Sequence, residues 1–232
     1  MKVAMVAFTR LADASVFNSE WASTLQPHDT DADVLAEGAG RQCYESWSRP
    51  NPRTRNNEDY LKHILEIDHT SIMEHSSATF RLTEVSRNLL VELTRHRHLS
   101  FSVQSQRYVD ESHGQMIIPP DIMGDTALSG LVEKIDHFHQ DAKILYDEIV
   151  DTMMKEGYKR KQARQAARAV LPGGHETRIV VTGNIRAWRH VIHMRFSEHA
   201  DVEICEMAGK ILGHLRIIAP NQVQDIGDDP RQ

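Results

Sequence analysis

The sequence predicts an α+β fold in which a small mixed or antiparallel sheet is flanked by long helices. Apolar residues recur at steps of three and four between positions 131 and 153, as in a long amphipathic helix. A second apolar face of the same period runs from 204 to 218. Segments with the composition or alternation of strands are few and short: 3–8, 76–82, 116–118 and 179–181. We expect one domain over residues 1–232, with a frayed tail from about residue 224.

The N-terminal half is predicted to combine short strands with short helices. Residues 3–8 form the first strand, and residues 31–46 form a helix. After a break at Pro50-Asn51-Pro52, a second helix begins at Asn57. Ser86 is the predicted N-cap of a helix that runs into Arg95.

The C-terminal half is predicted to be mainly helical. Two prolines, Pro119 and Pro120, stop the short strand before them, and Gly157 ends the long helix. Residues 160–170 form a further helix, and the strand at 179–181 leads into a helix over residues 184–196.

Composition excludes several classes of function. The net charge is −6 and the pI is near 6.1, which argues against a general nucleic-acid binder. Cys43 and Cys205 lack metal-like or redox-pair spacing, as expected for reduced thiols of a cytoplasmic protein. His69 and His75 are six residues apart, which suits one metal ion on a helix poorly. Because no apolar run approaches the length of a membrane span, we expect no membrane partner. The acidic net charge and the histidine spacing lead us to expect no nucleic acid and no metal.

Basic residues are concentrated in the segment 95–108. It contains three arginines, two histidines and three serines, and no acid. Arginine offers a rigid fork of donors that suits phosphate and other planar anions. A solvated basic loop is the simpler interpretation of such a run. The apolar residues between the charges argue instead for partial burial against an oxygen-rich anion.

The spacing within this segment resembles the signature of the flavin-dependent thymidylate synthases, in which Arg95-His96-Arg97 is followed, after seven residues, by Ser105. Residues 160–172 and 176–203 are also similar to that family, in the same order. The resemblance implies methylation of dUMP to dTMP with FAD as cofactor and with methylenetetrahydrofolate and NADPH as co-substrates. It also implies a homotetramer with active sites at subunit interfaces.

The resemblance assigns residues to two ligands. Positions that match nucleotide contacts are Arg87, Glu92, Leu93, Thr94, Arg95, Val103, Gln104, Ser105, Gln106, Arg107, Arg168 and Arg195. Positions that match flavin contacts are Ser71, Glu74, Arg95, His96, Arg97, Asn184, Ile185, Arg186, His190 and His199. In this scheme Arg107 and Arg168 hold phosphate, while Lys161 and Arg164 lie at the entrance, near anions of nucleotide, folate or NADPH.

Arg195 is the predicted catalytic residue. On a helical wheel it falls inside the apolar arc of residues 184–196, between Trp188 and Val191. A buried arginine needs an anionic partner, and the sequence leaves a ligand and a structural acid, Glu198 or Glu203, equally open. The resemblance favours the ligand, because the matching arginine of the family lies against the uracil ring.

The same wheel raises a conflict. Arg186 and His190 lie roughly opposite Arg195, so one pocket on one helix face cannot use all three. Either Asn184 and Arg186 precede the helix proper, or the helix lies between two parts of an interface.

Val103 departs from the family pattern, which has Gln or Glu at this position. Valine cannot make that hydrogen bond, so either Gln104 takes over through a shifted loop or the contact is lost. We expect nucleotide binding to be weaker than in family members with Gln.

Two alternative functions remain at this stage. One is a flavin- or nucleotide-binding relative without thymidylate synthase activity. The other is a nucleic-acid module that uses the helix at 160–168, which the acidic pI disfavours. Neither Cys43 nor Cys205 lies in a basic motif that would lower its pKa, so no cysteine nucleophile is expected.

Overall fold

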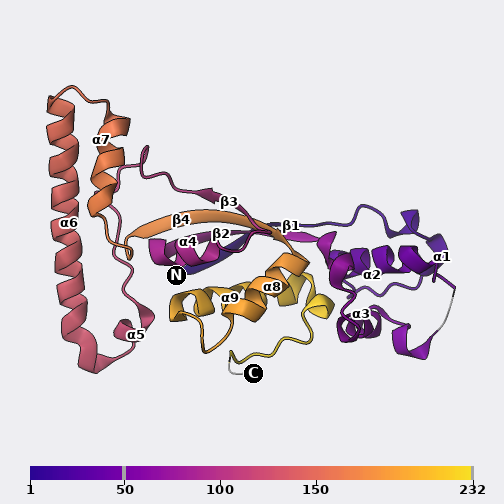
Figure 1. Ribbon diagram of the computed structural model, residues 1–232. Coiled ribbons are helices and arrows are strands. Elements are labelled where there is room, and N and C mark those ends of the chain that lie inside the picture. The colour runs from indigo at the N-terminus through magenta and orange to yellow at the C-terminus, as the bar shows by residue number, and fades with distance from the viewer. Residues whose placement is uncertain (49–50, 231–232) are drawn as a thin grey trace.

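The sheet at the centre of the molecule is antiparallel, with the strand order β1-β2-β4-β3. The computed structural model describes residues 1–48 and 51–230, so Pro50 of the predicted break lies outside the described residues. The strands are β1 (Lys2–Phe8), β2 (Ser77–Ser86), β3 (Ser100–Val103) and β4 (Glu176–Asn184) (Figure 1). The predicted α+β class with a small sheet is confirmed. Of the two sheet types expected, mixed and antiparallel, the described strands form an antiparallel sheet.

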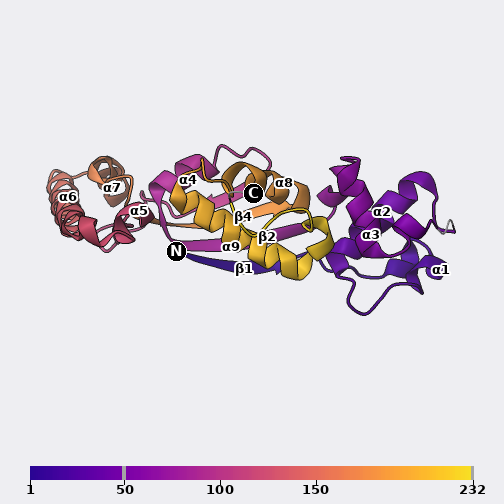
Figure 2. The same cartoon turned by 90° about the horizontal axis from the view of Figure 1, so that it is seen from below.

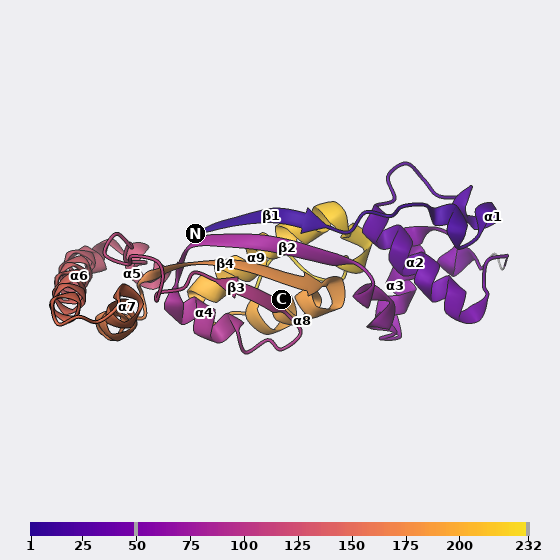
Figure 3. The same ribbon diagram turned by 90° about the horizontal axis from the view of Figure 1, so that it is seen from above.

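Helices cover one face of this sheet and leave the other face open. The covering helices are α4 (Arg87–Leu93), α8 (Ile185–Arg195) and α9 (Val202–Ile218). Figure 2 shows them in front of the strands, whereas Figure 3 shows the strands bare from the opposite side. Between the layers the ring of Trp188 meets Phe80 edge-on, with centroids 5.1 Å apart, and Trp188 Nε1 donates to the Ala78 carbonyl at 3.0 Å. These contacts fix α8 against the sheet.

Two groups of helices extend from opposite ends of the sheet (Figure 1). We call α1 (Ser19–Ala22), α2 (Asp31–Tyr44) and α3 (Asn57–Glu66) the helical lobe. We call α6 (Ser129–Lys155) and α7 (Arg160–Ala167) the arm, which follows the short α5 (Pro120–Met123). Gly157 turns the chain at the tip of the arm with φ 86°, a left-handed conformation that glycine adopts without strain.

Two strands pass directly into helices that carry candidate site residues. Ser86 ends β2 and caps α4, because its hydroxyl accepts the Leu89 N–H at 3.0 Å. Asn184 ends β4 and caps α8 by accepting the Ala187 N–H at 2.8 Å. The predicted cap at Ser86 is therefore confirmed, and both helices start at fixed points of the sheet.

The structure corrects several predicted boundaries. The helix after Ser86 ends at Leu93, and a tight turn follows in which Arg95 N–H bonds the Glu92 carbonyl. The strand expected at 116–118 is reduced to a single bridge from Met116 to His175, just before two prolines that cannot continue a ladder. Strand β3 was not predicted, although Ser100 and Ser102 alternate with the more buried Phe101 and Val103.

The C-terminal segment is bound to α8 and α9 through arginine side chains. Arg189 donates to the Gln222 carbonyl at 2.6 Å and pairs with Asp225 through two nitrogens. Arg216 donates to the carbonyls of Ile226 and Gly227. These contacts hold part of the expected tail, whose fraying stays a prediction; residues 231–232 lie outside the described residues. Within the described ranges, no helix is long and apolar enough to cross a bilayer.

Candidate active site

Residues 95–108, here called the motif edge, run along the outer strand of the sheet. Ser100 pairs with Thr182 and Val103 with Ile179, and Gln104 N–H continues the ladder by bonding the Arg178 carbonyl at 2.9 Å. Because β3 is antiparallel to β4, residues 95–99 lie where α8 begins. Residues 104–107 lie at the other end, where the arm joins the sheet. The motif edge therefore links two sites at the ends of one strand.

Arg195 lies at the C-terminal end of α8 and meets Glu92 of α4 and His96 of the motif edge. Its Nη1 donates to the Glu92 carboxylate at 2.8 Å, and its Nε donates to His96 Nε2 at 3.0 Å. The acid partner is therefore Glu92, and neither Glu198 nor Glu203 fills that role. Glu203 accepts hydrogen bonds from the backbone and side chain of Ser86 instead.

His96 is held in its neutral form. Burial, followed by the charges of Arg195, His190 and Arg95, lowers the pKa of His96 from 6.5 to about 4. Since Arg195 donates to Nε2, this nitrogen carries the lone pair and Nδ1 carries the proton. A neutral imidazole between arginines can lie against an aromatic ligand without adding to the positive charge.

A cavity of about 200 Å³ opens beside His96. It is lined by Arg95, His96, Arg97, His98, Leu99, Ala187 and His190. The His190 ring packs edge-on against His96, with centroids 5.9 Å apart. Four predicted flavin residues, Arg95, His96, Arg97 and His190, thus line one cavity.

The conflict on the helical wheel is resolved by His96 and by the cap. Asn184 does precede the helix proper, whereas Arg186 is its second residue and pairs with Glu74. His190 and Arg195 point to different sides of the helix, yet both reach His96, which lies between them. Glu74 ends the 3-10 helix η3 (Thr70–Glu74), so the flavin candidates Ser71 and Glu74 are brought to the start of α8.

The other end of the motif edge has buried donors without acceptors. Within the described residues, Gln106 Nε2 and Arg107 Nε are buried and find no hydrogen-bond partner. Nearby, Arg87 loses hydration, and the charge of Arg168 adds to this effect in lowering the Arg87 pKa, while Glu111 opposes it. Unpaired donors beside two mutually repelling cations favour an oxygen-rich anion at this end.

Arg164 and Lys161 are engaged by the protein rather than free at an entrance. Arg164 donates to the Tyr108 carbonyl at 2.6 Å and to Asp110 at 2.8 Å. The Lys161 ammonium lies 4.6 Å from the centroid of the Tyr108 ring. The α7 helix therefore holds the last residue of the motif edge, Tyr108, and the chain that follows it.

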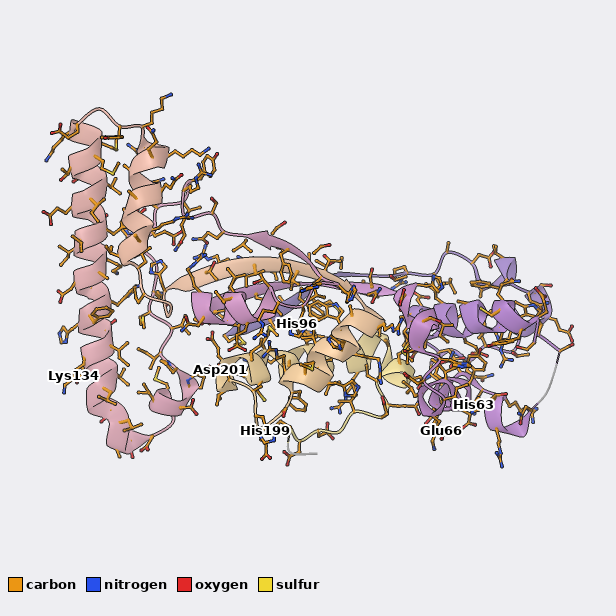
Figure 4. All side chains as sticks on the ribbon, in the orientation of Figure 1. His63, Glu66, His96, Lys134, His199 and Asp201 are labelled. Atoms are coloured by element: carbon orange, nitrogen blue, oxygen red, sulfur yellow. The ribbon has the colours of Figure 1, made fainter. Side chains whose placement is uncertain are left out.

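Four predicted site residues do not line the cavity at His96. Leu93 and Ile185 are fully buried in the core, which leaves only their backbones for contacts. Thr94 is exposed and its hydroxyl donates to the Val91 carbonyl. His199 lies beyond α8 with its side chain 88% exposed, at a distance from His96 in Figure 4. The cavity at His96 thus does not include His199.

The order Val103-Gln104 has a clear structural consequence. Val103 packs against the core, paired with Ile179. Gln104 turns its amide toward Glu111, with Nε2 at 3.3 Å and 3.5 Å from the two carboxylate oxygens.

Sequence reasoning missed three buried polar residues behind the motif edge: Glu111, His139 and His175. They are 1%, 1% and 0% exposed and form a hydrogen-bonded series. They are far apart in the sequence and share no motif spacing, so no sequence signal identifies them.

These features define a class: an α+β protein with an arginine- and histidine-lined cavity at one end of a strand and buried, unpaired donors beside two arginines at the other. Residues 24–221 match the family model described as thymidylate synthase complementing protein. A probable flavin-dependent thymidylate synthase of Mycobacterium phage D29 is 50% identical over 242 residues, covering 99% of this chain and 98% of that protein. A flavin-dependent thymidylate synthase of Mycobacterium tuberculosis (strain ATCC 25177 / H37Ra) is 49% identical over 205 residues, covering 84% of this chain and 80% of that protein.

The chain belongs to the family of flavin-dependent thymidylate synthases. The resemblance inferred from the motif spacing is therefore confirmed, as is the prediction of an enzyme of this kind.

Proposed function

We propose that this chain, acting as a single domain, makes dTMP from dUMP, with methylenetetrahydrofolate as carbon donor, NADPH as reductant and FAD as bound cofactor. Once reduced by NADPH, the bound flavin would supply the hydride that completes the methyl group. The absence of a cysteine nucleophile is part of this proposal. The protein's own contribution is to bind, orient and polarise the reactants.

The observation that carries the proposal is the pair of buried, unpaired donors in the motif, Gln106 Nε2 and Arg107 Nε. Native proteins seldom leave such atoms without an acceptor. A nucleotide phosphate offers several acceptor oxygens, and Arg107, Arg168 and Arg87 supply matching positive charge. This end of the motif edge therefore suits the phosphate of dUMP.

The opposite end suits the flavin and the base. The cavity at His96 combines a neutral imidazole with Arg95 and Arg97, which fits an aromatic ring system that carries phosphates. Arg195, the catalytic residue of this proposal, is oriented by Glu92 and His96. Its positive charge stabilises negative charge on a pyrimidine carbonyl, which activates the ring.

The test is spectroscopic and radiochemical. Purified protein is expected to be yellow, and to release tritium from 5-tritiated dUMP only when folate and reductant are present. Protein that stays colourless after incubation with FAD would contradict the proposal. Protein that binds FAD and dUMP yet releases no tritium would instead indicate a relative without methyl transfer.

We also propose a homotetramer. On α6, Leu131, Phe138 and Leu145 follow one another at steps of seven and are 41%, 60% and 43% exposed. A stripe of this kind on a helix matches the seam of a helix pair, so it supports burial by a second copy. Light scattering is expected to give four times the mass of the chain, and a monomer would contradict this part of the proposal.

A further inference from the structure

A buried series of hydrogen bonds joins the arm to the motif edge; we call it the relay. Gln104 Nε2 lies 3.3 Å from Glu111 Oε1, Glu111 Oε2 lies 3.0 Å from His175 Nε2, and His175 Nδ1 lies 2.9 Å from His139 Nε2. Gln104 follows β3, His175 precedes β4, and His139 belongs to α6. The relay thus crosses the end of the sheet at which the arm stands in Figure 1.

The following proton positions give every hydrogen bond of the relay one donor and one acceptor. An ionised carboxylate only accepts, so both Gln104 Nε2 and His175 Nε2 donate to Glu111. In the His175 tautomer that carries its proton on Nε2, Nδ1 has a lone pair and accepts from His139 Nε2. Each member therefore holds the next in one orientation, and the Gln104 amide cannot flip without losing its bond.

The surroundings leave the relay little freedom. A side-chain carbon on Gly114 would lie 2.3 Å from His175 Nε2, so only glycine fits beside that ring. The Tyr146 hydroxyl of α6 accepts the Glu111 N–H at 3.5 Å. The two ring nitrogens of His175 point to different partners, so the three groups do not converge on one metal ion.

The candidate phosphate donors lie in the chain between Gln104 and Tyr108, and both of these residues are anchored. Gln104 is fixed by Glu111, and the residues after the motif are fixed by Arg164, which binds Tyr108 and Asp110. Between these anchors lie Ser105, Gln106 and Arg107. Both anchors depend on the arm, through His139 on α6 and Arg164 on α7. The sheet supports this loop through the Gln104 N–H, which donates to the Arg178 carbonyl.

We propose that Glu111, held by His175 and His139, is a positioning residue that orients the loop 104–107 for binding of the dUMP phosphate. The proposal rests on the function proposed above. A loop ordered before the nucleotide arrives does not have to be ordered by it, so an intact relay tightens nucleotide binding. The flavin cavity lies at the other end of β3 and does not depend on the relay.

The test measures the Kd of dUMP for the FAD-loaded protein by calorimetry, with the KM and kcat of tritium release and the FAD content. His139→Leu and Glu111→Gln are each expected to raise Kd and KM roughly tenfold, about the effect of one hydrogen bond, with kcat and FAD content within about twofold of wild type. His139→Gln retains a donor for His175 and is expected to restore most of the affinity. His137→Leu, at an exposed position of the same helix, is the matched control and is expected to bind like wild type.

A double-mutant cycle separates positioning from general destabilisation. Gln104 is half-exposed, so the Gln104→Leu variant is expected to fold. It is expected to raise the dUMP Kd as much as Glu111→Gln does. Because both act through one bond, the double variant is expected to bind no worse than either single variant. If the losses of affinity add in the double variant, the positioning proposal is overturned and the proposed function stands. The same holds if the wild-type protein is active and the relay variants bind dUMP as tightly as it does. A wild-type protein that binds no dUMP overturns the proposed function together with it.

Discussion

The helical lobe and the motif edge both bury charged groups, but only the lobe satisfies all of them internally. In the lobe, Glu37 accepts from Trp21 Nε1 at 3.1 Å, from Arg41 Nε at 2.6 Å and from Asn57 Nδ2 at 2.8 Å. On the motif edge, Gln106 and Arg107 keep buried donors that find no acceptor among the described residues. The arrangement in the lobe is complete without a ligand, whereas the motif edge keeps unpaired donors that suit one.

Cavity size alone would point to the wrong region. The lobe borders a cavity of about 780 Å³, whereas the cavity at His96 is about 200 Å³. The donors and acceptors decide between them, because a fully paired network offers a ligand nothing to complete. The variants below test whether the lobe serves stability and the motif edge serves binding.

The largest effect is expected from Glu37→Leu. It leaves Arg41 buried without its acid partner, which lowers the free energy of unfolding by about 3–5 kcal/mol. The folded protein is expected to bind FAD normally. Urea denaturation gives the stability, and Glu58→Leu at an exposed lobe position, with a change within about 0.5 kcal/mol, is the control. Equal stability of the Glu37 and Glu58 variants would remove the structural role of the lobe network.

Asp33 makes the stability of the lobe depend on pH. Burial, opposed by bonds from Asn221 and Gln222, raises the pKa of this fully buried carboxyl from 3.8 to about 6. The folded state therefore binds the proton more tightly than the unfolded state, and stability falls as pH rises from about 4 through 6. The loss is about 3 kcal/mol. Denaturation of wild type and Asp33→Asn at pH 4 and pH 7 measures it; a wild-type advantage that does not shrink at pH 7 contradicts this assignment.

Arg107→Leu is expected to show the opposite behaviour to Glu37→Leu. It removes a buried unpaired donor, so the free energy of unfolding changes by less than about 0.5 kcal/mol or increases. The dUMP Kd is expected to rise by the value of a charged hydrogen bond, about 1.5–3 kcal/mol, or roughly 10- to 150-fold. Calorimetry with dUMP measures this. A large loss of stability with unchanged dUMP affinity would mean that Arg107 serves stability, as the network of the lobe does.

The smallest effect is expected from the cysteines. Cys43 lies in the lobe on α2 and Cys205 lies on α9, so neither belongs to the motif edge. The double variant Cys43→Ser, Cys205→Ala is expected to release tritium from 5-tritiated dUMP within about twofold of wild type, because no covalent cysteine adduct is needed. Loss of activity in a folded variant would show that a thiol takes part.

Local sequence patterns predicted what depends on neighbouring residues. The period of α6 and α9, the cap at Ser86 and the apolar arc of α8 all follow from spacing along the chain. Strand β3 escaped prediction because its four residues lie inside the basic segment 95–108 and were interpreted with it, although Ser100 and Ser102 alternate with Phe101 and Val103.

Contacts between distant segments were beyond sequence reasoning. Arg195 meets Glu92 across 103 positions, and the local acids Glu198 and Glu203 were the natural candidates. The pairing of His139 with His175 depends on how the arm docks on the sheet, which no single segment encodes.

In the proposed function, the motif edge holds a nucleotide beside a flavin. The direct measurement is a titration of purified, FAD-loaded protein with dUMP, followed by the visible absorption of the flavin. We expect a saturable change in the flavin spectrum for wild type and for Glu58→Leu, and the same change at a much higher dUMP concentration for Arg107→Leu. A spectrum that does not respond to dUMP, or an Arg107→Leu curve that overlays wild type, would contradict it.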